Sequence, residues 1–131
     1  MEAVHRPRVL LVEEEALVRL DLALALSDAG FDAIEVANAE DALAVLSATP
    51  EIKVMITDVN LAGSLDGAKL SWMARHKWPP LHIIVVSGQH RVEEMQLPER
   101  SLFFPKPYRA RRLVNAVREL LNSERPALAK A

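Results

Sequence analysis

The sequence contains no cysteine. This absence excludes disulfide bonds, thiolate metal sites and a cysteine nucleophile, and it is compatible with a reducing compartment. Residues 1–10 lack the apolar segment of a secretory signal peptide, and no part of the chain approaches the roughly 18 uncharged residues of a membrane span. We therefore expect a soluble, cytoplasmic protein that makes no contact with a membrane.

An excess of charge of either sign is also missing, because 16 Lys and Arg residues stand against 18 Asp and Glu residues. The net charge of −2 creates no overall field that would draw the chain to nucleic acid. With 131 residues, 50% of them hydrophobic, the chain has the size and composition of one globular domain. We predict a short extension over 1–7, a single domain over 8–123 and a tail over 124–131, with no effector domain.

Short apolar runs alternate with helix-forming segments along the chain. The pattern predicts strands over 8–12, 31–36, 52–57, 81–86 and 102–104, and helices over 16–29, 38–48, 67–78 and 108–122. A further helix within 89–100 would be short and interrupted by Pro98. Such alternation predicts an α/β fold, in which right-handed crossovers join a doubly wound parallel sheet. We expect a flavodoxin-like, five-stranded sheet of order 2-1-3-4-5 with helices on both faces.

Polar side chains follow several of these strands where each strand ends: Glu13, Glu14, Asp58, Ser87 and Lys106. The carboxyl ends of parallel strands meet at one edge of a sheet, so these side chains are predicted to lie together. Three carboxylates in one place raise one another's pKa unless a cation lies among them. Mg²⁺ prefers such oxygen ligands and commonly bridges to phosphate. A carboxylate nucleophile beside Mg²⁺, an ammonium and a hydroxyl is sufficient for phosphoryl transfer.

The segments VLLVEEEALVR, VMITDVNLAGSLDG, IIVVSG and FFPKPY carry these residues. Their order and spacing resemble the receiver domains of response regulators in bacterial two-component signalling. By this resemblance Asp58 is the phosphoacceptor, Glu13 and Glu14 are the acidic pair that binds Mg²⁺ with Asp58, and the metal also takes the backbone carbonyl of Asn60. Ser87 would hydrogen-bond a phosphoryl oxygen.

The resemblance further implies that Lys106 pairs with Asp58 or its phosphate, and that the Lys106–Pro107 peptide bond is cis. It implies a signalling switch rather than an enzyme. A histidine kinase or a histidine phosphotransfer protein would donate the phosphoryl group to Asp58, and an unidentified downstream protein would receive the signal.

Three positions depart from the family pattern. Glu14 stands where the family normally has Asp, and its extra methylene moves the carboxylate outward by about 1.5 Å, which is large for an octahedral Mg²⁺ site. Ser64 makes its loop one residue longer. Phe103 occupies the ring position that couples to Ser87, so an aromatic rotamer switch remains available without a ring hydroxyl. The alternative function is therefore a pseudo-receiver, an interaction module with weak or no metal-dependent phosphorylation.

The first predicted helix has two apolar stripes. Val18, Leu22 and Leu26 lie on one side of a helical wheel, and Leu17, Leu20 and Leu24 lie on roughly the opposite side. Only one stripe can face the sheet, so the second is a candidate partner surface. In the family that the chain resembles, the histidine-bearing bundle docks on this helix. Homodimer formation stays open.

Other function classes fit the residues less well. Enzymes of the haloacid-dehalogenase type have a second Asp two residues after the nucleophile, where this chain has Asn60. A dinucleotide-binding site needs a glycine-rich loop where Glu13, Glu14 and Glu15 stand. The basic side of the last predicted helix has no accompanying aromatic platform for nucleic acid.

Overall fold

The computed structural model describes residues 6–88 and 96–123. Five strands form one parallel sheet: β1 Arg8–Val12, β2 Asp32–Val36, β3 Val54–Asp58, β4 His82–Ser87 and β5 Ser101–Pro105. Their order is β2-β1-β3-β4-β5. The predicted doubly wound sheet is confirmed.

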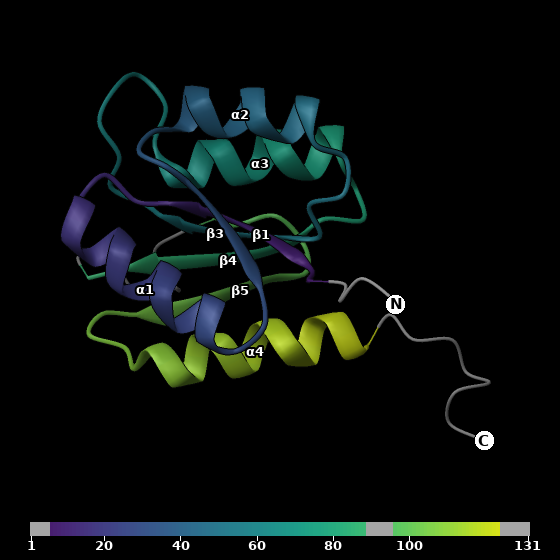
Figure 1. The fold of residues 1–131 in the computed structure, drawn as a ribbon. Coiled ribbons are helices and arrows are strands. Elements are labelled where there is room, and N and C mark those ends of the chain that lie inside the picture. The colour runs from purple at the N-terminus through teal and green to yellow at the C-terminus, as the bar shows by residue number, and fades with distance from the viewer. Residues whose placement is uncertain (1–5, 89–95, 124–131) are drawn as a thin grey trace.

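Helices cover both faces of this sheet (Figure 1). They are α1 Ala16–Asp28, α2 Ala39–Ala48, α3 Gly67–Lys77 and α4 Ala110–Asn122. The helices α1 and α4 pack on one face, and α2 and α3 pack on the other. Within residues 6–88 and 96–123, no helix is both long and apolar enough to cross a membrane.

Alternation along the strands explains the two layers. In β1, Val9 and Leu11 face α1 and α4, whereas Leu10 and Val12 face α2 and α3. All four side chains are at most 1% exposed. A strand buried on both faces is a continuous apolar run, which is why the sequence predicts a parallel sheet.

Some element ends differ from the prediction. Ile52 is buried but lies before β3, because its N–H bonds to the carbonyl of Thr49 in a turn rather than to a strand. Helix α4 begins at Ala110, not at residue 108, because Arg109 has an extended conformation. Of the further helix predicted within 89–100, residues 89–95 lie outside the described residues and 96–100 contain a turn but no helix.

Candidate functional site

The carboxyl ends of the strands bring the predicted residues together. Asp58 ends β3, Ser87 ends β4, and Glu13 directly follows β1. Their exposures are only 5%, 1% and 4%. Lys106 follows β5, and its backbone N–H donates to the Ser87 carbonyl at 3.0 Å. The Lys106–Pro107 peptide bond is cis, as expected.

Lys106 joins the two buried carboxylates. Its Nζ atom donates a hydrogen bond to Asp58 Oδ2 and lies 3.5 Å from Glu13 Oε1. The Lys106 side chain is 28% exposed, so it reaches inward from the rim of the site. A buried carboxylate is costly unless it is paired, and the ammonium group therefore allows the two acids to share this edge.

The main chain holds the other oxygen of each carboxylate. The N–H of Asn60 donates to Asp58 Oδ1 at 3.1 Å, and the N–H of Glu15 donates to Glu13 Oε2 at 3.0 Å. Each acid thus has one oxygen bound to a backbone amide and the other directed at Lys106. These contacts set the orientation of both carboxylates.

The site contains more acid than base. Burial raises the pKa of Glu13, the hydrogen bond from Glu15 lowers it, and the negative charge of Asp58 raises it further. Burial lowers the pKa of Lys106. The hydrogen bond to Asp58 and the negative charges of Asp58 and Glu13 raise it, and their effect is the larger, so the pKa of Lys106 is raised. Lys106 is therefore cationic at neutral pH, and a second positive charge would favour the ionised form of Glu13.

These residues fit a partly hydrated Mg²⁺ ion. Such an ion is held by one or two carboxylates and completes its coordination with water and phosphate oxygens. Glu13 and Asp58 provide two carboxylates, and Asn60 is exposed beside them. Glu14 is exposed, and in the part of the chain that the structure describes no three His, Asp or Glu side chains come together as a metal site. Of the predicted acidic pair, Glu13 is buried beside Asp58, whereas the Glu14 side chain is exposed.

Ser87 and Phe103 lie on the same face of the sheet. Phe103 pairs with Val85, and Val85 shares a face with Ser87 because strand side chains alternate. Phe103 is partly buried against the cluster that contains Val85. This placement is compatible with the Ser87–Phe103 switch that the sequence suggests.

The exposed stripe of α1 is also present. Leu17, Leu20 and Leu24 are 81%, 47% and 56% exposed, whereas Leu22 and Leu26 are buried in the core. The prediction that only one stripe of α1 faces the core is confirmed at Leu22 and Leu26, whereas Val18, near the start of the helix, is half-buried.

Sequence reasoning missed two residues near the site. Arg19 donates from Nη1 to the Glu13 carbonyl at 2.7 Å. Tyr108 is partly buried against the core. Burial raises the pKa of its hydroxyl, the positive charge of Lys106 lowers it, and the negative charges of Glu13 and Asp58 raise it. Arg19 could have been found, because long side chains in a first helical turn lean back toward the preceding loop.

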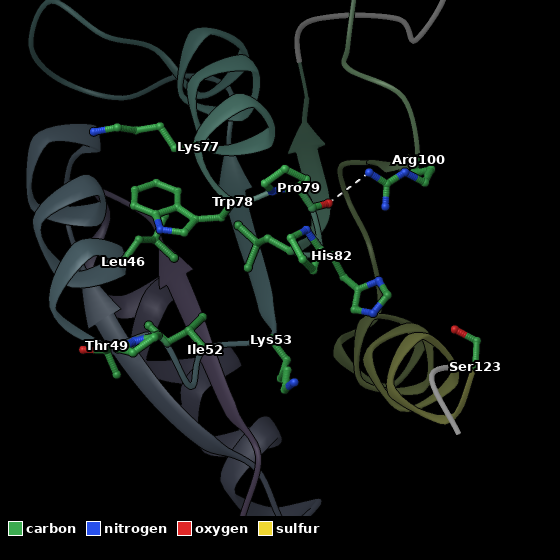
Figure 2. Close-up of a pocket in the computed structure, with 13 residues that line it drawn as sticks. Leu46, Thr49, Ile52, Lys53, Lys77, Trp78, Pro79, His82, Arg100 and Ser123 are labelled. Carbon is green, nitrogen blue, oxygen red and sulfur yellow. Dashed lines mark hydrogen bonds between the residues drawn. The ribbon is translucent and has the colours of Figure 1, made fainter. Parts of the chain in front are cut away.

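A cavity of about 640 Å³ lies at the amino ends of β3 and β4, the end of the sheet opposite the predicted site. None of the predicted site residues lines it (Figure 2). Lys53, Lys77 and Arg100 line it, and Arg100 donates to the Pro79 carbonyl at 2.9 Å. The residues that cap the carboxyl ends of α2, α3 and α4 line it too: Thr49, Trp78 and Ser123. Cations at this end offset the negative ends of the helix dipoles, so their presence requires no ligand.

A family model described as the response regulator receiver domain matches residues 9–118. The chain is 34% identical to the putative response regulator NtrX-like of Rickettsia felis, over 65% of this chain and 18% of that protein. It is 32% identical to the response regulator protein FleR of Pseudomonas aeruginosa, over 84% of this chain and 24% of that protein. The matches to these relatives thus cover less than a quarter of the relatives' own length.

Solved structures give the same picture. A response regulator receiver protein from Sinorhizobium medicae WSM419 superimposes with a TM-score of 0.83 and 29% identity, covering 94% of this chain and all of that one. The receiver domain of the hybrid histidine kinase CckA gives a TM-score of 0.74 and 30% identity, over 87% of this chain and 98% of that domain.

Proposed function

Because this chain belongs to the response regulator receiver domain family, we propose that it is a phosphorylation switch in which Asp58 accepts the phosphoryl group. One observation carries this proposal. Asp58 is buried at the carboxyl end of the sheet, with one oxygen held by the Asn60 N–H and the other by Lys106. A carboxylate held in this way is oriented for in-line attack on phosphorus.

The donor is a histidine kinase or a histidine phosphotransfer protein. An Asp58 oxygen attacks the phosphorus of its phosphohistidine, a P–O bond forms as the P–N bond breaks, and the imidazole leaves. Lys106 neutralises charge on the transferred group, and the Ser87 hydroxyl donates to one of its oxygens. Bound Mg²⁺, held by Glu13, Asp58, the Asn60 carbonyl and an inward-turned Glu14, would neutralise further charge.

The exposed stripe of α1 is the proposed docking surface for the donor. Leu17, Leu20 and Leu24 lie on the helix that follows the acidic loop, so a helical bundle seated there brings its histidine to Asp58. After transfer, rearrangement of Ser87 and Phe103 alters the surface at β5 for a downstream protein. Neither nucleic acid nor a membrane is a proposed partner, and the expected location is the cytoplasm.

Intact-mass measurement tests the proposal. The protein is incubated with acetyl phosphate and Mg²⁺, with a parallel sample in EDTA. We expect one added phosphoryl group with Mg²⁺, much less in EDTA, and none in Asp58→Asn. Asp28→Asn, which changes an exposed aspartate at the end of α1, should behave as wild type. Phosphorylation that persists in Asp58→Asn would contradict the assignment.

A further inference from the structure

Arg19 connects the acidic loop to the outermost strand of the sheet. Its Nη1 donates to the Glu13 carbonyl at 2.7 Å, and its Nε lies 3.3 Å from Glu35 Oε1 on β2. Only 21% of its side chain is exposed. A single guanidinium thus ties the loop, α1 and β2 together.

The bond from Arg19 completes the set that fixes Glu13. The Glu13 N–H donates to the Val36 carbonyl at 3.1 Å, and its carboxylate accepts from the Glu15 N–H at 3.0 Å. The carbonyl of Glu13 accepts from Arg19. Every polar group of Glu13 therefore has a protein partner, and Arg19 supplies the one that sets the plane of the peptide leading into Glu14.

From these contacts we infer that the Arg19–Glu35 pair is a positioning device for the acidic loop, one that presents Glu13 and Glu14 to the divalent cation of the phosphorylation site. The inference rests on the proposed function. Glu35 restrains the guanidinium, and the guanidinium in turn restrains the peptide between Glu13 and Glu14. In this role neither residue would contact the phosphoryl group itself.

The chemistry of the contact requires arginine. A guanidinium presents several N–H groups in a rigid plane, so it can serve a carbonyl on one edge and a carboxylate on another. An ammonium is a point donor without that planar fork, so Arg19→Lys should bind Mg²⁺ little better than Arg19→Gln does. Partners that orient metal-binding groups typically change metal affinity about 10–100-fold when they are removed.

The test is Mg²⁺ titration by calorimetry of wild type, Arg19→Gln, Glu35→Gln and the double variant, followed by acetyl phosphate phosphorylation over a range of Mg²⁺. We expect about tenfold weaker binding in Arg19→Gln. The double variant should resemble Arg19→Gln, because the two residues act as one unit. The Mg²⁺ concentration for half-maximal phosphorylation should rise, while the rate at saturating Mg²⁺ recovers toward wild type.

Arg8→Gln is the matched control. Arg8 Nε lies 3.4 Å from Asp32 Oδ2, and this ion pair also joins β1 to β2, at the end of the strands far from the acidic loop. If Arg19 only stabilises the fold, Arg19→Gln and Arg8→Gln should bind Mg²⁺ with the same affinity. This result would overturn the inference. Wild-type protein that neither binds Mg²⁺ nor becomes phosphorylated would instead overturn the proposed function, and the inference with it.

Discussion

Gly67, the first residue of α3, lies directly against the main chain of Asp58. A Cβ atom at position 67 would overlap the Asp58 carbonyl and crowd the Cα atom of Val59. The Gly67 N–H also donates to the Val59 carbonyl at 2.8 Å. Any side chain here would push α3 away from the end of β3 that carries the proposed phosphoacceptor.

We therefore expect Gly67→Ala to destabilise the protein by about 1–3 kcal/mol, as overpacking does. The sign is informative, because Gly→Ala inside a helix ordinarily stabilises by about 1 kcal/mol. Urea unfolding measures the change. Gly30→Ala is the control, since Gly30 has φ +97° and a Cβ atom there would meet no other atom within 4 Å. Both variants should lose stability, but only Gly67→Ala should also slow phosphorylation by acetyl phosphate. A Gly67→Ala protein as stable as wild type would contradict the close contact.

The buried carboxylate of Glu13 should affect stability in a pH-dependent way. Burial raises its folded-state pKa above 4.5, so the folded protein holds this proton more tightly than the unfolded chain. The contribution of Glu13 to the free energy of unfolding is therefore fully present below about pH 4.5, and it is lost as the pH rises through the raised pKa.

Unfolding of the metal-free protein in EDTA, measured across this pH range, checks the sign. Relative to wild type, Glu13→Gln should gain stability as the pH rises and then level off. Glu14→Gln controls for loss of a charge in the same loop. A Glu13→Gln protein that instead loses stability relative to wild type as the pH rises would show that the electrostatic argument is wrong.

The exposed stripe of α1 makes a separate prediction. Leu20→Asp should slow transfer from a phosphorylated kinase or phosphotransfer protein about tenfold or more, because burying one Leu against a partner is worth roughly 1.5–3 kcal/mol. Phosphorylation by acetyl phosphate and thermal stability should change little. Leu102→Asp, at a 38% exposed leucine on β5, serves as the matched control. Equal transfer rates in wild type and Leu20→Asp would remove α1 as the docking surface.

Glu14 is predicted to limit the affinity for Mg²⁺. The side chain is exposed in the structure, so it must turn inward and lose rotamer freedom to reach the ion. Calorimetric titration should show tighter Mg²⁺ binding in Glu14→Asp than in wild type. Unchanged or weaker binding would indicate that the loop containing Ser64 has adapted to the longer side chain. The Ser64 hydroxyl donates a hydrogen bond to Glu40 Oε2 at 3.3 Å, and this bond links the loop to α2.

Local signals in the sequence account for most of the fold. The sequence predicts that Asn38 begins a helix, and its side chain accepts from the Asp41 N–H at 2.8 Å. It predicts that Gly30 ends one, and the positive φ of Gly30 is the conformation that glycine tolerates best. Such features depend on neighbouring residues only, so the sequence displays them directly.

The details of the site depend on contacts between distant segments, and the sequence displays those poorly. Three consecutive glutamates look alike in the sequence, yet Glu13 is buried while Glu14 and Glu15 are exposed. The difference arises because the Glu13 N–H continues the pairing with β2. The ion pair between Arg19 and Glu35 joins residues 16 positions apart, and the periodicity of the sequence gives no indication of it.

If Asp58 is the phosphoacceptor, the acyl phosphate lies on its side chain, and chemical trapping can locate it there. Borohydride converts an aspartyl phosphate to homoserine, and trypsin should release residues 54–69, which contain Asp58 and Asp66. Asp66 is an internal control, because its side chain caps α3 by accepting from the Lys69 N–H at 2.8 Å. Fragmentation of this peptide after treatment with acetyl phosphate and Mg²⁺ should place homoserine at position 58 and leave Asp66 unchanged. Homoserine at position 66, or in any other peptide, would show that a residue other than Asp58 accepts the phosphoryl group.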